Sequence, residues 1–154
     1  MLIDKLKKYP AHYIRRIQQI SNALFARECG AFDLTAVQYA ALVAMQRFPN
    51  SDQSTIASSI GYDKVTMGKV LEKLEARGLL VRSPDPENRR AKLTNITPHG
   101  AELIDTVKPR VDRLNEELVS PLTQAEQAEF MRMLQKIVEA HNESSRAPVR
   151  VGKS

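Results

Sequence analysis

Two helical patterns lie almost end to end in the middle of the sequence, with little more than a glycine between them. The segment from Ser51 to Ile60 predicts a short helix, and the segment from Asp63 to Arg77 predicts a longer one. The chain must therefore turn sharply at Gly61, where glycine adopts a backbone conformation that other residues resist. The longer helix has one apolar face, because Met67, Val70, Leu71 and Leu74 recur at helical spacing. This is the pattern of a helix-turn-helix.

Small and apolar residues on both sides of the turn favour close packing of these two helices. Ala57 is small where the helices would cross, and Ile56 and Ile60 supply apolar contacts. An ordinary pair of packed core helices would show much the same spacing. The residues that follow decide between the two interpretations.

A β-hairpin is predicted directly after the longer helix. Leu79 to Arg82 is short and apolar, Ser83 to Asn88 is rich in turn residues, and Ala91 to Ile96 alternates with a period of two. The connection contains two prolines, which cannot donate to a sheet ladder, so an extended loop facing solvent is expected.

The segment before the helix-turn-helix predicts two further helices. Pro10 suits a first helical turn, and apolar residues recur at helical spacing from there to Gly30. A second apolar run follows, with Asp33 or Thr35 as its cap and a turn signal at residues 48–50.

Two more helices are predicted after the hairpin. Thr97 caps the first of them and is followed by a proline, while Thr123 and Glu126 form a capping box for the second. Pro109 is expected to kink the first helix. Its apolar seam comprises Ile104, Val107, Val111, Leu114 and Leu118, and the last helix carries Phe130, Leu134, Ile137, Val138 and His141 on one face. These faces exceed what one small winged domain needs to cover, so dimerisation through them is expected.

Charge is distributed unevenly along the chain. The 23 Lys and Arg outnumber the 18 Asp and Glu, and this formal charge of +5 only weakly favours a polyanionic partner. Between Gly61 and Lys92, however, eight basic residues stand against five acidic ones, whereas Asp112 to Glu143 holds seven acids and three bases. The middle of the chain is therefore expected to meet a polyanion while the acidic C-terminal third faces away.

The candidate DNA contacts fall on three neighbouring segments. The second helix of a helix-turn-helix enters the major groove, and its candidates are Lys64, Val65, Thr66, Gly68, Lys69 and Lys73. Gln53, Ser54 and Thr55 open the preceding helix, where hydroxyl, amide and main-chain N–H groups can bind phosphates. Asn88, Arg89, Arg90 and Lys92 belong to the hairpin, whose tip suits insertion of a guanidinium into a minor groove. Each residue alone would be an ordinary solvated group, so the prediction depends on their convergence.

The sequence resembles the MarR family of winged helix-turn-helix regulators. The resemblance rests on the order of the helices and on three stretches: Leu74 to Arg82, Pro84 to Lys92, and Leu93 to Gly100. It extends from about Tyr9 to His141, and the hairpin is its most specific part.

This resemblance implies a mainly α-helical fold with a small β-hairpin wing. Residues 1–154 would form a single protomer, with a winged helix-turn-helix lobe over about 31–98, dimerisation helices at 9–30 and 99–143, and a flexible tail at 144–154. The family's wing arginine corresponds to Arg90, and the acid that orients it corresponds to Asn88. The sequence departs from the family there, because Asn88 can hydrogen-bond but brings no charge.

The resemblance further implies a homodimeric, sequence-specific regulator, a repressor, that binds a pseudo-palindromic DNA operator. A small phenolic or aromatic carboxylic acid would release it by binding between the dimer helices and the DNA-binding lobe. A set able to stack on a ring and pair with a carboxylate consists of Tyr9, His12, Tyr13, Arg16 and Tyr39. Tyrosines at helical spacing are, on the other hand, common in interface cores.

The sequence also bears on three other functions: catalysis, protein binding alone and a response to oxidants. The three histidines are scattered, and neither a phosphate-binding glycine loop, a nucleophile elbow nor metal-ligand spacing is seen, so no catalytic residue, metal or cofactor is predicted. A winged domain used only for protein contacts, or an oxidant-responsive regulator using Cys29, are the alternatives. Without a long apolar segment or an apolar leader, a cytoplasmic protein that does not contact membranes is expected.

Overall fold

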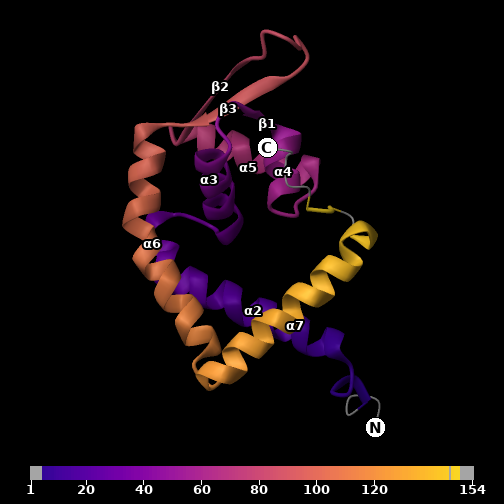
Figure 1. The fold of residues 1–154 in the computed structure, drawn as a ribbon. Helices are drawn as coiled ribbons and strands as arrows, with labels where there is room; N and C mark the ends of the chain where they lie inside the picture. The colour runs from indigo at the N-terminus through magenta and orange to yellow at the C-terminus, as the bar shows by residue number, and fades with distance from the viewer. Residues whose placement is uncertain (1–4, 146, 150–154) are drawn as a thin grey trace.

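A lobe of short helices and a small sheet lies above long helices, one of which also runs up along the side of the lobe (Figure 1). This computed structural model describes residues 5–145 and 147–149. The elements in chain order are α2 (Pro10–Cys29), η1 (Gly30–Phe32), α3 (Ala36–Arg47), β1 (Ser51–Asp52), α4 (Gln53–Ser59), α5 (Lys64–Ala76), β2 (Leu80–Pro84), β3 (Lys92–Ile96), α6 (Pro98–Val119), α7 (Gln124–His141) and η2 (Asn142–Ser144). The mainly helical winged helix-turn-helix fold predicted from the sequence is confirmed.

The sheet has three antiparallel strands in the order β1-β3-β2. The predicted hairpin is formed by β2 and β3, with Leu80 opposite Ile96. The prediction of a helix from Ser51 was wrong for its first two residues, because Ser51 pairs with Thr94 as an edge strand. The Thr94 hydroxyl donates a 2.7 Å hydrogen bond to the carbonyl oxygen of Ser51, which joins the start of the helix-turn-helix to the hairpin.

The helix starts follow the capping chemistry of the sequence. Thr35 and Thr123 each close a capping box, with Gln38 and Glu126 as the reciprocal partners. Thr97 caps α6 and is followed by Pro98 at the first helical position, as predicted. The α6 helix continues through Pro109, and Figure 1 shows it bending along its length.

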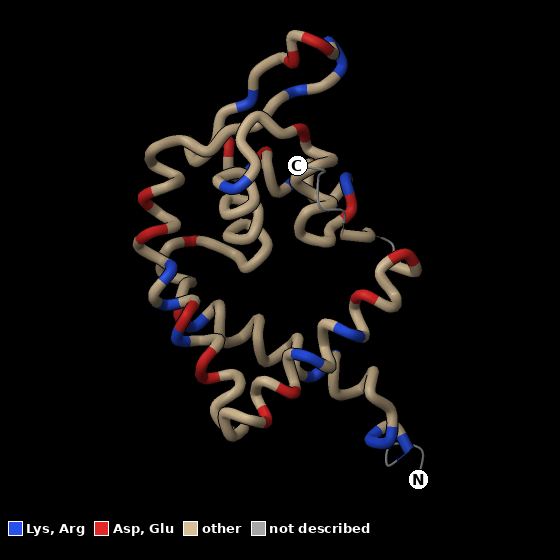
Figure 2. Tube along the Cα trace, in the orientation of Figure 1, with Lys and Arg blue, Asp and Glu red and all other residues tan. Residues whose placement is uncertain are grey.

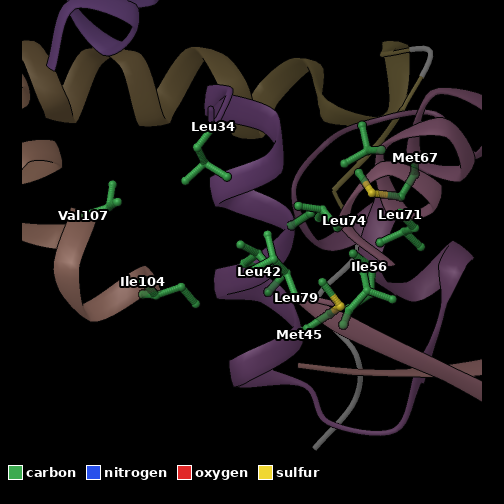
Figure 3. Close-up of a cluster of buried hydrophobic side chains, with 14 of the residues drawn as sticks. Leu34, Leu42, Met45, Ile56, Met67, Leu71, Leu74, Leu79, Ile104 and Val107 are labelled. Carbon is green, nitrogen blue, oxygen red and sulfur yellow. The ribbon is translucent and has the colours of Figure 1, made fainter. Parts of the chain in front are cut away.

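The core lies between α3, α4, α5 and the sheet. Figure 3 shows Leu42 and Met45 of α3 facing Ile56 of α4 and Leu71 of α5. Ile104 and Val107 of α6 lie to one side, and they extend the core toward the long helices (Figure 3). The apolar residues that recur at helical spacing in α5 therefore form the buried face that holds this helix in the lobe.

The long helix α7 is different, because none of its residues is buried. Ile137 and Val138 are 52% and 59% exposed. A groove of about 900 Å³ lies between α2, the end of α6 and the first half of α7, and its lining includes Ile14, Phe130 and Leu134. The apolar face predicted for the last helix thus lies open in the single chain.

Part of the segment expected to be flexible has defined contacts. Of residues 144–154, the structure describes 144, 145 and 147–149; the rest lie outside the described residues. The Asn142 side chain donates a 3.0 Å hydrogen bond to the Val149 carbonyl oxygen and accepts a 2.9 Å bond from its N–H. These two bonds join Val149 to the end of the last helix, and the flexibility expected of the tail stays a prediction.

Candidate nucleic-acid interface

The first turns of α4 and α5 and the two strands of the wing meet around one recess of about 420 Å³. Six predicted DNA contacts line it: Gln53, Ser54, Lys64, Asn88, Arg90 and Lys92. Asp52, Arg82, Ala91 and Thr94 complete the lining. Three segments separated in sequence thus converge on one basic, polar surface.

The remaining predicted residues lie outside the lining of this recess. Val65 is 73% exposed at the start of α5, and Lys69 and Lys73 are exposed further along the same helix. Arg89 is exposed in the loop at the wing tip. Figure 2 shows basic residues on both arms of the wing and at its tip, interrupted by acidic residues in the loop.

Aspartates cap both helices of the helix-turn-helix, and this changes two of the predicted roles. Asp52 Oδ1 accepts a 2.8 Å hydrogen bond from the Thr55 N–H, so this N–H is not free to bind a phosphate as predicted. Asp63 accepts from both the N–H and the hydroxyl of Thr66, at 2.8 and 2.7 Å. These bonds from Thr66 lower the pKa of Asp63, which stays ionised at the start of α5. The Thr66 hydroxyl is therefore already engaged.

Gly68 lies against the side chain of Gln53. A Cβ at this position would lie 3.0 Å from Gln53 Nε2, so glycine makes room for a side chain of α4. Gln53 Nε2 donates a 2.7 Å hydrogen bond to the Lys64 carbonyl oxygen. This bond ties the first turns of α4 and α5 together and occupies part of the Gln53 amide.

The wing tip is shaped by hydrogen bonds between side chain and backbone. Asn88 Oδ1 accepts from the Arg90 N–H at 3.1 Å, and the Asn88 carbonyl oxygen accepts from the Ala91 N–H at 2.9 Å. Asn88 thus fixes the turn through the backbone of Arg90. Across the described chain no acid pairs with the Arg90 guanidinium, which remains exposed.

An ion pair that sequence reasoning missed joins the wing to α5. Arg82 on β2 donates through Nε and Nη2 to Glu75 Oε2, at 2.8 and 2.5 Å. Arg82, and to a lesser extent Lys92, lower the pKa of the Glu75 carboxyl. The two residues are seven positions apart on different kinds of element, so neither periodicity rule pairs them. The only available signal was an acid and a base on either side of a predicted turn.

In the described part of the chain, the predicted effector residues lie in two places, at the start of α2 and beside its end. Tyr9 and Tyr13 are 58% and 52% exposed near the start of α2, where the Tyr13 ring packs edge-on against His12 at 5.3 Å between centroids. Arg16 donates to the neighbouring Gln19 side chain. Tyr39 instead packs near Phe25, which is roughly 18 Å further along α2 than Tyr13 at 1.5 Å per residue. Within one chain these residues therefore lie in two separate places, and their role in effector binding stays a prediction.

The described residues contain neither a metal-binding cluster nor a membrane-spanning helix. No group of three or more His, Cys, Asp or Glu side chains there is arranged to hold a metal ion. None of the helices in that part of the chain has the length and apolar character needed to span a membrane.

Comparisons with known proteins agree with this geometry. The model of the MarR family matches residues 32–91. The transcriptional repressor NicR of Pseudomonas putida is 28% identical over 84% of this chain and 82% of its own length. The PcaV transcriptional regulator of Streptomyces coelicolor, solved with its natural ligand, is 32% identical, with a TM-score of 0.82 over 88% of this chain and 95% of PcaV.

The chain belongs to the MarR family. It is a winged helix-turn-helix transcription regulator, and the resemblance inferred from the hairpin residues is confirmed. BpsR of Bordetella bronchiseptica, whose DNA binding is regulated by 6-hydroxynicotinic acid, is 28% identical with a TM-score of 0.80, over 84% of this chain and 93% of BpsR. In this MarR-family chain, the amide of Asn88 organises the wing turn without contributing a charge.

Proposed function

We propose that this chain is a homodimeric repressor that binds a pseudo-palindromic DNA operator and is released by a small aromatic acid. The observation that carries the proposal is the recess between the helix-turn-helix and the wing. It gathers Lys64, Arg90 and Lys92 from α5, the wing loop and β3 onto one surface. Such a surface suits a duplex whose phosphates border two grooves.

The two arms of the surface have separate roles in this proposal. The start of α5 enters the major groove, where Lys64 meets a phosphate or a guanine edge and the exposed Val65 meets a thymine methyl. The wing places the exposed Arg90 guanidinium in the adjacent minor groove. Phosphate binding falls to side chains such as Ser54, because Asp52 already occupies the Thr55 N–H.

Dimerisation is supported by the open apolar surface of the long helices. The α7 helix buries none of its residues, and Tyr13, Ile14 and Ile20 of α2 are between 44% and 52% exposed. Monomeric proteins rarely leave apolar faces of this extent in water. A second copy related by two-fold symmetry would cover them and would present two recognition helices to two half-sites.

An aromatic acid is favoured as the effector by the relatives. BpsR responds to 6-hydroxynicotinic acid, an aromatic acid, and PcaV was solved with its natural ligand. In this chain, Tyr13, His12 and Arg16 lie exposed or half-exposed on the first turns of α2, where a ring could stack and a carboxylate could pair. Tyr39 packs near Phe25, toward the other end of α2, so it cannot complete this site within the same chain. We therefore expect a second chain to supply the remaining contacts of the proposed site.

The oxidant-responsive alternative is less favoured by the structure. Cys29 is fully buried, and burial raises the pKa of its thiol, so less of the reactive thiolate is present at neutral pH. A winged domain used only for protein contacts would not require exposed cations beside a groove-shaped recess.

Alanine substitutions at Lys64 and Arg90 test the DNA-binding proposal. Each should weaken binding to the chain's own promoter DNA about tenfold, as expected for loss of one specific contact. Loss of Lys64 should also reduce the slope of log affinity against log salt by about one. Fluorescence anisotropy with labelled duplexes at several salt concentrations measures both quantities.

Lys136→Ala is the matched control, because Lys136 is an exposed lysine on α7, away from the recess. It should leave the affinity within about twofold of the unsubstituted protein. The proposal is wrong if the unsubstituted protein shows no preference for its own promoter region over random DNA at physiological salt.

A further inference from the structure

The ion pair between Arg82 and Glu75 lies at the base of the wing, where β2 leaves the lobe. Glu75 belongs to the last turn of α5, so the pair joins the recognition helix directly to the strand that carries the wing. Both donors of Arg82 converge on one oxygen of Glu75, Oε2. A bond of this kind restricts the angle between the two elements more than a single contact would.

Arg82 also differs from the other cations of the recess in being sheltered. Its side chain is only 17% exposed, whereas Arg90 and Lys92 are exposed. Its charge is already neutralised by Glu75, so it has little left to offer a phosphate. On β3, Thr94 lies opposite Arg82 and bonds to Ser51, so the same point of the sheet is also tied to β1.

We infer that Arg82 and Glu75 are positioning residues that set the wing at a fixed angle to the recognition helix. This inference rests on the proposed DNA-binding function and extends it to two residues that need not touch DNA. The distance between the start of α5 and Arg90 determines whether one protomer can reach a major and a minor groove together. The pair would maintain that distance before DNA binds, which lowers the ordering cost on binding.

Replacing Glu75 with glutamine separates a positioning role from a purely electrostatic one, because the two roles predict opposite changes in operator affinity. Removing an acid near DNA should strengthen binding if only charge matters. If Glu75 holds the wing in place, E75Q should instead weaken operator binding about fivefold to tenfold. E72Q is the charge-matched control on the same helix, since Glu72 is exposed, and it should bind operator at least as tightly as the unsubstituted protein.

A double-substitution cycle with Arg90 tests whether the pair acts through the wing. In the unsubstituted background R90A should cost about tenfold in affinity, and in the E75Q background less than about threefold, because a loose wing already loses much of that contact. R82K keeps the charge but not the two-donor contact, so it should weaken binding in the same direction as E75Q. Anisotropy on one operator duplex measures all of these variants.

Hydrogen exchange on the DNA-free protein supplies a readout that does not depend on DNA. The amides of β2 and β3 should exchange faster in E75Q than in E72Q, while α3 stays protected. The inference is overturned if E75Q binds operator as tightly as E72Q, or if the penalties of E75Q and R90A simply multiply. Those results leave the proposed function intact, whereas a lack of specific binding by the unsubstituted protein would refute both.

Discussion

Replacement of Ile137 with aspartate is expected to convert the dimer into separate chains. Ile137 is 52% exposed on α7, so the substitution should leave the single chain folded. In a two-fold dimer through this face, the interface would contain two new carboxylates, one from each chain. Both carboxylates would lose their hydration. Dimer affinity should fall on the order of 100-fold or more. Sedimentation and light scattering at micromolar concentration measure the change in mass.

The same variant should lose nearly all operator affinity, because one half-site supplies only half of the contacts. Gln135→Asp is the matched control, since it adds the same charge at an exposed position on the opposite side of α7. Q135D should remain dimeric and should bind DNA normally. An I137D protein that keeps both the mass of a dimer and its operator affinity would exclude this face as the interface.

Replacement of Gly100 with alanine is expected to cause the largest loss of folding stability. Gly100 is buried in the first turn of α6, where an added Cβ would lie 2.2 Å from the Leu79 carbonyl oxygen and 2.7 Å from Ile96 Cγ1. The same carbonyl accepts a 3.1 Å hydrogen bond from the Thr97 N–H, so the backbone cannot move away without breaking this bond. The free energy of unfolding should decrease by about 3 kcal/mol or more, which is a large part of the stability of a typical domain.

Gly30→Ala provides the control for glycine replacement itself. Gly30 lies at the end of α2 with helical backbone angles, and nothing lies within 4 Å of an added Cβ. Its replacement should leave stability unchanged or raise it slightly, because the unfolded chain becomes less flexible. Urea unfolding followed by circular dichroism compares the two variants. If G100A unfolds at the same urea concentration as G30A, Gly100 of α6 does not lie in close contact with Leu79, the residue before β2.

Local signals predicted most of this fold. Thr97 and Thr123 mark helix starts because a cap acts on residues only three positions away. The buried face of α5 follows from its periodicity. The wing follows from a short apolar run and an alternating run on the two sides of a loop that contains proline. The two-residue strand at Ser51 could not be found in this way. It exists because of pairing with Thr94, which lies 43 residues further along the chain.

The sequence predicts that candidate residues from the helix-turn-helix and the wing share one surface, but it does not predict which side chains they contact. The positions of Lys64 and Arg90 on one surface follow from the helix-turn-helix and the wing. The neighbour of Gly68 could not be predicted, because Gln53 reaches it from another helix. The pairing of Arg82 with Glu75 likewise depends on the angle between a helix and a strand, which no periodicity encodes.

Selection of DNA from a random pool is the most direct test of the central claim, that two copies of this chain read a two-fold operator. Purified protein at physiological salt should enrich an inverted repeat, with half-sites separated by about 10 bp or a multiple of it, centre to centre. The K64A and R90A variants should enrich it less strongly. A pool that shows no enriched sequence, or a single unrepeated half-site, would contradict the account.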